Sequence, residues 1–251
     1  MADATPLHGR WESVVYGPIR SRRLGNSLGL NLIPRHAKLC ELDCPYCSCG
    51  FTTVKAADTR WPSPDEVAHQ LLRALERLPH PPDWICFSGN GEPTLHPRFA
   101  IVVERVLAVR DAWVPDVRVA VLSNGLAAGR PPIRDALRRL DARIMKLDPG
   151  PRERVNGAPF DASRLAADYR ALKPVTIQVT VVRGSDWDGS SPESLAAWLT
   201  VVRVADPDVV QLCSIDRPPA DATVQNVPRE RLLTMAATIR EALPRSVVDV
   251  Y

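Results

Sequence analysis

Short apolar runs alternate with amphipathic segments along most of the chain. The runs predict strands, and apolar residues recurring every three or four positions predict helices. The expected strands are residues 27–33, 84–88, 117–122, 143–147, 175–182 and 209–215, with a short seventh at 247–251. The expected helices are one that opens at Ser63 and others at residues 97–113, 133–140, 161–172, 192–205 and 229–243.

These elements form six consecutive strand–helix units. The strands are apolar on both faces, as parallel strands covered by helices must be. Six units are too few for an eight-stranded barrel, so the pattern predicts either an open doubly wound sheet or a partial barrel. In both architectures ligands bind at the carboxyl ends of the strands. We therefore expect any chemistry in the loops that directly follow strands.

The composition is that of a folded protein. Of the 251 residues, 45% are hydrophobic and 24% are charged, which argues against disorder. No run of about 18 apolar residues predicts a membrane span, and residues 1–10 lack a signal-peptide core, so a cytoplasmic location is expected. The net charge of +3 neither requires nor excludes a polyanionic partner. In a reducing compartment we expect the six cysteines to be metal ligands, reactive thiols or core residues rather than members of disulfides.

Four of the six cysteines fall within ten positions, directly after the first expected strand: Cys40, Cys44, Cys47 and Cys49. The first three have the spacing C-x3-C-x2-C. Three thiolates on one short loop can hold an iron–sulfur cube and leave one iron open to a small molecule. One alternative is a structural zinc site with Cys49 as fourth ligand. The corresponding alternative function is a non-catalytic scaffold that binds zinc or a cluster. Cys86 and Cys213 stand alone within strands, where core thiols are expected.

The cysteine motif, with Tyr46 before its last cysteine, resembles the radical S-adenosylmethionine superfamily. Three further motifs follow the next strands in order. They are Ser88-Gly-Asn-Gly-Glu-Pro, which is similar to the family's glycine-glycine-glutamate motif, Ser123-Asn-Gly and Lys146-Leu-Asp. The resemblance covers roughly residues 14–217. It implies a partial (β/α)6 TIM-type barrel with parallel strands. We expect one domain over residues 1–251, ending in a helix and a short strand at 228–251.

A narrower resemblance rests on the segment from Tyr16 to Gly29 and on His96-Pro, which follow the pattern of small bacterial and archaeal radical proteins. These are grouped with wyosine-type tRNA-modifying synthases, so modification of a tRNA base is the alternative reaction. Arg20, Arg22 and Arg23 form either a phosphate site or a solvated turn. His96 either contacts a substrate or caps the next helix.

The superfamily resemblance implies a [4Fe–4S] cluster and S-adenosylmethionine as cofactors. The cofactor is cleaved reductively to a 5′-deoxyadenosyl radical, which abstracts hydrogen from a substrate. An electron donor such as flavodoxin or ferredoxin is implied, and a small-molecule or nucleotide substrate is expected. tRNA is a possible partner, and a membrane is not expected.

The resemblance also assigns residues. The implied iron ligands are Cys40, Cys44 and Cys47. The implied cofactor-binding residues are Tyr46, Gly89, Asn90, Gly91, Glu92, Ser123, Asn124, Gln178, Leu212 and Ile215. The implied catalytic residues are Lys146, which can pair with a carboxylate, and Asp148, which can bind the ribose. Thr180, Asp216 and Arg217 are further candidates for contact with cofactor or substrate.

Overall fold

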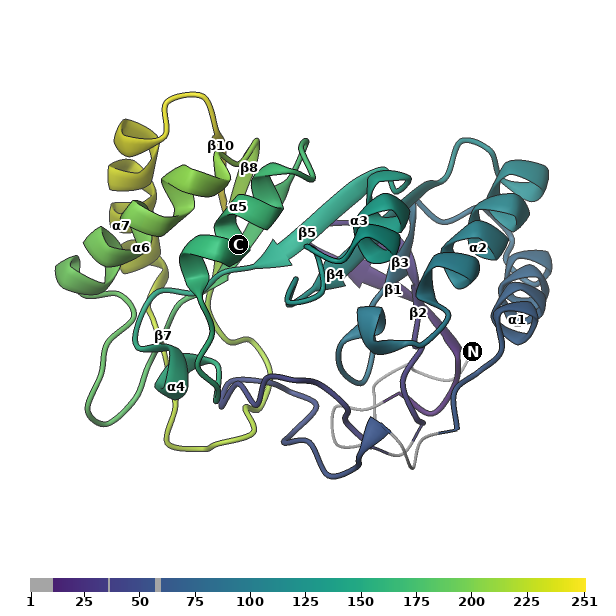
Figure 1. Cartoon of the computed structure of the whole chain (residues 1–251), viewed down its shortest axis with the longest axis horizontal. Coiled ribbons are helices and arrows are strands. Elements are labelled where there is room, and N and C mark those ends of the chain that lie inside the picture. The colour runs from purple at the N-terminus through teal and green to yellow at the C-terminus, as the bar shows by residue number, and fades with distance from the viewer. Residues whose placement is uncertain (1–10, 36, 57–59) are drawn as a thin grey trace. The chain divides into compact units, whose positions relative to one another are not determined.

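The computed structural model describes residues 11–35, 37–56 and 60–251 (Figure 1). The chain folds into two compact units. The first contains residues up to 40, 52–123 and 130–143, and the second contains residues 41–51, 124–129 and 144–251. The expectation of a single domain stays a prediction.

The strands of the first unit run in the order β1-β2-β3-β4. Their bounds are β1 Val15–Ser21, β2 Gly25–Leu30, β3 Trp84–Phe87 and β4 Arg118–Ser123. β2, β3 and β4 are parallel, whereas β1 is antiparallel to β2. β1 was not predicted, because Gly17-Pro18 inside it is a turn signal. The structure absorbs that dipeptide in an irregularity of the β1–β2 register between Tyr16 and Ile19.

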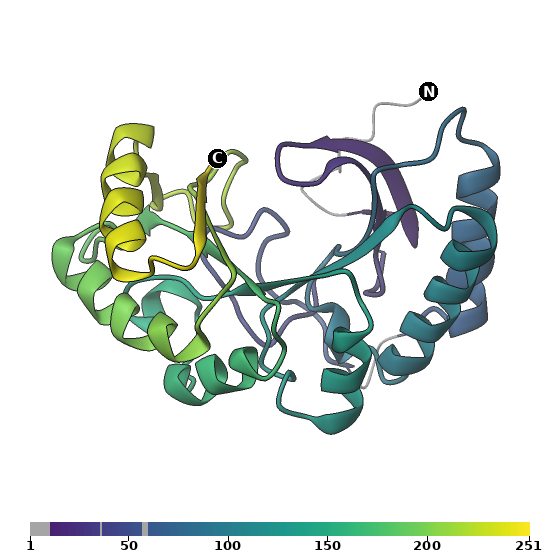
Figure 2. The same ribbon diagram turned by 90° about the horizontal axis from the view of Figure 1, so that it is seen from above.

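The helices of the first unit are α1 Pro64–Glu76, the short η3 Pro93–Leu95, α2 Phe99–Trp113 and α3 Pro131–Arg138. α1 begins as its capping signal predicts: the Glu66 backbone N–H donates to the Ser63 hydroxyl at 3.0 Å. α1 packs on α2, and α2 on α3. Figure 2 shows α1 and α2 along one face of these strands.

The strands of the second unit run in the order β5-β6-β8-β10, all parallel. Their bounds are β5 Ala142–Lys146, β6 Thr176–Thr180, β8 Val209–Cys213 and β10 Val247–Val250; the first two residues of β5 belong to the first unit. The helices are α4 Arg152–Val155, α5 Ala162–Arg170, α6 Pro192–Ala205 and α7 Arg229–Ala242. A small antiparallel pair, β7 Val182–Arg183 and β9 Gln225–Asn226, completes the unit. All seven predicted parallel strands and all six predicted helices are confirmed.

The two faces of the second sheet differ in polarity. Met145, Ile177 and Val210 occupy one row of register neighbours and are fully buried. α5 packs on α6 and α6 on α7, and α7 also packs on β10 (Figure 2). The next row, on the opposite face, is polar throughout and contains Lys146, Gln178, Gln211 and Asp249. Packing of an apolar core does not explain why polar side chains occupy this row.

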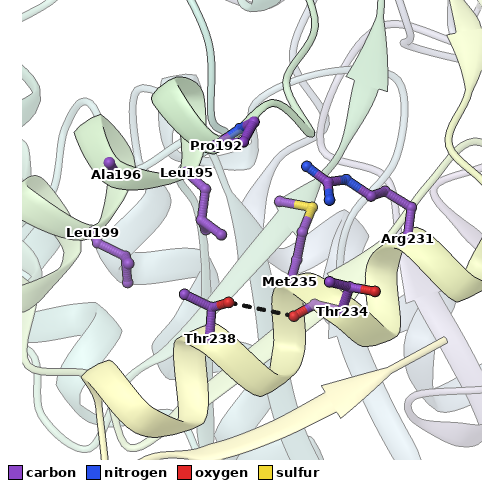
Figure 3. Close-up of a pocket in the computed structure, with 8 residues that line it drawn as sticks. All are labelled: Pro192, Leu195, Ala196, Leu199, Arg231, Thr234, Met235 and Thr238. Carbon is purple, nitrogen blue, oxygen red and sulfur yellow. Dashed lines mark hydrogen bonds between the residues drawn. The ribbon is translucent and has the colours of Figure 1, made fainter.

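A shallow hollow lies between α6 and α7 (Figure 3). Its lining is mainly aliphatic, with Leu195, Leu199 and Met235 beside the two threonines of α7. It lies between two helices and contains none of the predicted site residues. No helix in the described part of the chain is long and apolar enough to cross a membrane.

Candidate cofactor site

In the first unit, the glycine loop after β3 lies against the residue that precedes the cysteine motif. The Leu39 N–H donates to the Asn90 carbonyl at 3.1 Å, and the Glu92 N–H donates to the Leu39 carbonyl at 3.0 Å. Gly91 has φ +152°, and a Cβ there would lie 1.8 Å from the Leu39 oxygen. Only glycine permits this approach. Gly91 thus fixes the backbone next to Cys40.

Asn90 is fully buried and binds the chain's own backbone. Its Oδ1 accepts from the Trp11 N–H at 2.6 Å, and its Nδ2 donates to the carbonyls of Trp11 at 2.8 Å and Pro34 at 3.0 Å. The amide therefore has its partners within the protein. The glycine at position 89 also has a structural explanation, because a Cβ there would lie 2.4 Å from the Asn31 Oδ1. The cofactor contacts implied for Asn90 and Gly89 stay predictions.

Glu92 and Ser123, both implied cofactor residues, are brought together by the carboxyl ends of β3 and β4. The Ser123 hydroxyl donates to Glu92 Oε1 at 2.8 Å. The same oxygen accepts from the Thr94 hydroxyl at 2.6 Å and the Thr94 N–H at 3.0 Å, which caps η3. Glu92 and Ser123 are both buried. Burial is tolerated because the carboxylate is hydrogen-bonded.

His96 is the C-cap of η3, whereas the N-cap of α2 is Arg98 without a side-chain cap, so the expected capping of the next helix is not found. Its Nδ1 accepts from the Arg98 N–H at 3.1 Å, and its Nε2 lies 2.8 Å from the Pro62 carbonyl. This pairing requires the neutral ring with the proton on Nε2. Burial lowers the pKa of His96 below its ordinary value of 6.5. The ring is 3% exposed, so it is committed to packing.

In the second unit, Asp148 is the centre of a hydrogen-bond network. Its carboxylate is fully buried. Oδ1 accepts from the Thr180 N–H at 2.7 Å and lies 3.0 Å from the Lys146 ammonium. Oδ2 accepts from the Tyr46 hydroxyl and from Asn156 Nδ2 at 3.2 Å. Asp148 thereby joins the ends of β5 and β6 to the cysteine loop.

Asn156 bridges that network to a cysteine. Its Nδ2 lies 3.5 Å from Cys44 Sγ, within the range of an N–H···S hydrogen bond. Its carbonyl accepts from the Asp43 N–H at 3.0 Å. Gly157, at φ +72°, permits this contact, because a Cβ there would lie 2.6 Å from the Asp43 oxygen. Asn156 was missed as a site residue, because Asn-Gly signals a turn but no chemistry.

The loop after β8 holds the cysteine loop from another side. The Asp221 N–H donates to the Pro45 carbonyl at 2.9 Å. Within the motif, the Cys47 N–H donates to the Cys44 carbonyl at 3.0 Å, which closes a turn around Tyr46. The segment from Cys44 to Cys47 is thus fixed before any ligand binds. Such pre-organisation is typical of a binding loop on a rigid scaffold.

The surroundings hold two groups of this loop in their neutral forms. Burial, followed by the charge of Asp148, raises the pKa of Cys44. Burial and the same charge raise the pKa of Tyr46 well above its ordinary value. Tyr46 is therefore a permanent hydrogen-bond donor to Asp148. A bound cation opposes the shift at a thiol, because it favours the thiolate.

Lys146 and Asn124 are also held by the second unit. The Tyr169 hydroxyl lies 2.8 Å from the carbonyls of both residues. The Lys146 ammonium, besides its ion pair, donates to the Thr180 hydroxyl. Asn124 Nδ2 donates to Glu41 Oε2 at 2.9 Å, next to Cys40 in the chain. The buried Tyr169 was missed, because a tyrosine within a helix is ordinary core.

The remaining predicted residues fall into two groups. Gln178 points to the polar face of its strand, whereas Leu212 is fully buried on the opposite face. Ile215, Asp216 and Arg217 follow β8 in a loop, the last two exposed. The roles stated for Gln178, Leu212, Ile215, Asp216 and Arg217 stay predictions.

The donor set of the cysteine motif fits an iron–sulfur cluster. All six described cysteines are without a disulfide. In the described residues, no three His, Cys, Asp or Glu side chains converge on a single point, as one metal ion requires. A [4Fe–4S] cluster does not need that convergence, because each thiolate binds a different iron. The N–H of Asn156 next to Cys44 Sγ also suits an iron-bound thiolate, which accepts such hydrogen bonds.

Comparison with known proteins agrees with the motif. Residues 35–147 match the model of the Radical SAM superfamily, whose members use a [4Fe–4S] cluster and S-adenosylmethionine. The chain is 27% identical over 215 residues to a UPF0026 protein of Helicobacter pylori, covering 82% of this chain and 67% of that one. It is 33% identical over 138 residues to a UPF0026 protein of Methanocaldococcus jannaschii, covering 54% and 40%. It is also 29% identical over 213 residues to a protein named GTPase Obg of Brachyspira hyodysenteriae, covering 81% of this chain but only 30% of that longer protein.

Solved structures confirm the fold class. The Streptococcus suis SuiB structure bound to precursor peptide SuiA matches with TM-score 0.64 and 11% identity, over 89% of this chain and 48% of that one. A spore photoproduct lyase mutant matches with TM-score 0.60 and 11% identity, over 93% and 79%. These likenesses confirm an α/β fold of the partial TIM-barrel type with a largely parallel sheet. The chain spans about half the length of SuiB.

Proposed function

From the radical SAM superfamily domain over residues 35–147, we propose that this protein is a radical S-adenosylmethionine enzyme with a cluster held by Cys40, Cys44 and Cys47. The observation that carries the proposal is the network of Asp148. It fixes Tyr46 between two proposed ligands, and through Asn156 it reaches the sulfur of Cys44. A surface loop with no ligand would not need a fully buried carboxylate beneath it.

A reduced [4Fe–4S] cluster held by the three cysteines would supply the electron for reductive cleavage of bound S-adenosylmethionine, the source of radical hydrogen abstraction in this proposal. The protein's residues position these groups. Asp148 and Asn156 orient the cysteine loop, and Gly91 fixes the chain at Leu39 beside Cys40. Glu92 and Ser123 order the glycine loop whose backbone faces the amino-acid part of the cofactor in this proposal.

The electron donor in this proposal is a small redox protein such as flavodoxin or ferredoxin. Lys146 and Asp148 act as positioning residues, since both are engaged with each other and with Thr180. Modification of a tRNA base is the alternative reaction. The support for it is that Arg20 and Arg22 are exposed at the β1–β2 hairpin, where they can meet phosphate. Salt-sensitive binding of tRNA, lost in Arg20→Gln, tests that alternative.

The test is reductive cleavage by anaerobically purified protein. With dithionite and S-adenosylmethionine, the protein should release 5′-deoxyadenosine in amounts that exceed the protein added. Cys44→Ala should abolish release, and Cys86→Ala, which removes a core thiol outside the motif, should retain it. A wild-type protein that holds a full cluster and releases no 5′-deoxyadenosine would contradict the proposed activity.

A further inference from the structure

Two glutamines on neighbouring strands of the second unit are buried without hydrogen-bond partners for one atom each. Gln178 on β6 is 6% exposed and Gln211 on β8 is 8% exposed. Gln178 Nε2 and Gln211 Oε1 find no partner among the described residues. A buried polar atom without a partner destabilises the folded protein, because it loses its hydrogen bonds to water and gains none. Two at adjacent positions are therefore an observation that core packing does not explain.

The register places these amides side by side. Gln178 pairs with Lys146 on one side and with Gln211 on the other, and Gln211 pairs with Asp249 of β10. Residues paired in a parallel sheet project from the same face. The row thus crosses four strands, about 14 Å at a spacing of about 4.8 Å. Lys146 is occupied by Asp148 and Thr180, so the available groups are the two amides and the Asp249 carboxylate.

The row lies directly below the cysteine network. Thr180 and Cys213 lie two residues farther along β6 and β8 on the same face, and Asp148 lies two residues beyond Lys146, the last residue of β5. Two residues of a strand span about 7 Å. A ligand held at the row would therefore lie one layer beneath Asp148, which binds Tyr46 of the cysteine loop. This position joins the row to the proposed chemistry.

We propose that Gln178 and Gln211 form a substrate-recognition site for the lactam edge of a planar heterocycle. Gln178 offers a donor beside the acceptor of Gln211, so the ligand must present an adjacent acceptor and donor on one side. A lactam ring does so because its amide is cis, whereas a peptide bond is trans and directs its C=O and N–H to opposite sides. A primary carboxamide presents the same adjacent acceptor and donor, but the group is much shorter than the polar row that crosses the four strands.

The inference rests on the proposed function, and its test uses probes that do not require turnover. Binding of inosine, which has a lactam edge, is measured by calorimetry with anaerobically purified protein. Its matched probe is 1-methylinosine, in which a methyl group blocks the lactam N–H. We expect saturable binding of inosine and at least about tenfold weaker binding of 1-methylinosine, since losing a buried hydrogen bond leaves its partner unpaired.

Variants locate the site. Gln178→Leu and Gln211→Leu should each weaken inosine binding by about tenfold or more and should raise the urea midpoint of the ligand-free protein, because each removes an unpaired buried amide. Gln225→Leu, on the exposed β9, is the matched control and should change neither. An oligoribonucleotide that contains one inosine shows whether the natural ligand is a base within RNA or a free small molecule. If the protein binds the oligoribonucleotide more tightly than free inosine, the ligand is part of RNA; if it binds the oligoribonucleotide more weakly, the ligand is a small molecule.

Absent inosine binding, equal binding of both probes, or unchanged binding in both leucine variants would overturn the site. A fall in the urea midpoint of both variants would also overturn it, since the amides would then stabilise the protein itself. Iron content and 5′-deoxyadenosine release are measured on the same preparations. If these fail while inosine binding persists, the proposed chemistry fails alone; if they persist without inosine binding, the recognition site fails alone.

Discussion

The hydroxyl of Tyr46 donates a hydrogen bond to the buried carboxylate of Asp148, 102 residues away in the sequence. Tyr46 lies inside the cysteine motif, and Asp148 lies two residues after the end of β5. This bond ties a loop of sparse secondary structure to the carboxyl end of a core strand. The geometry of the proposed cluster ligands therefore depends on a residue that binds no metal itself.

Replacing Asp148 by Asn should separate these roles. The substitution keeps the shape but removes the charge that faces Lys146, so we expect the free energy of unfolding to fall by about 3 kcal/mol. Iron content after anaerobic reconstitution should fall as well, because the Tyr46 anchor weakens. Urea denaturation and iron analysis measure the two effects. Asp161→Asn, at the exposed N-cap of α5, is the control and should behave as wild type, since Asn caps helices well.

Gly91→Ala tests the contact between the glycine loop and the cysteine motif. The added Cβ would collide with the Leu39 carbonyl, and the backbone has φ +152°. We expect a loss of about 2 kcal/mol or more of unfolding free energy together with reduced iron binding. Gly50→Ala is the matched control, because Gly50 has φ +82° but no atom within 4 Å of its Cβ position. Equal losses in the two variants would mean that backbone strain, and not the Leu39 contact, explains the glycine.

Asn156→Leu should alter the proposed cluster without preventing its assembly. Nδ2 of Asn156 lies 3.5 Å from Cys44 Sγ, and hydrogen bonds to sulfur raise the reduction potential of a cluster. We expect a midpoint potential more negative than that of wild type, measured by an EPR-monitored redox titration. The same potential in both proteins would show that this N–H does not act on the ligand sulfur.

His96 predicts a pH dependence of stability. The folded protein favours the neutral ring, and its pKa lies below the ordinary value of 6.5. Above about pH 6.5 the ring is neutral in both folded and unfolded chains, so its stabilisation is fully present. As the pH falls below that value the unfolded chain binds the proton first, and the free energy of unfolding decreases.

Urea midpoints at about pH 7.5 and about pH 5.5 measure this effect. His96→Gln should reduce the difference between the two midpoints, whereas His69→Gln, at an exposed position of α1, should leave it unchanged. An unchanged difference in His96→Gln would assign the pH dependence to other groups.

The parallel core was predictable because its signal is local. The apolar runs at β3 to β6, β8 and β10 and the caps of α1 and α6 are read from neighbouring residues. β1 was not, because Gly17-Pro18 breaks its pattern and its partner β2 supplies the stability. Pairing between distant residues overrides local propensity there.

The site was predictable in its residue types and less so in its contacts. The motifs select Cys44, Glu92 and Asp148. They give no sign that Asn156 reaches a sulfur or that Gln211 Oε1 finds no partner among the described residues. Those facts depend on residues more than 30 positions apart meeting at strand ends. Asn90 illustrates the converse: its motif suggests a ligand contact, and the fold uses its amide to hold Trp11 and Pro34.

The central claim is tested most directly by EPR of the reduced protein, with and without S-adenosylmethionine, in alanine variants of the four clustered cysteines. Wild type and Cys49→Ala should show a cluster of about four irons whose spectrum changes when the cofactor is added. Cys40→Ala, Cys44→Ala and Cys47→Ala should lack that signal. Loss of the cluster in Cys49→Ala, or a spectrum indifferent to the cofactor, would mean that no iron is left open and would contradict the account.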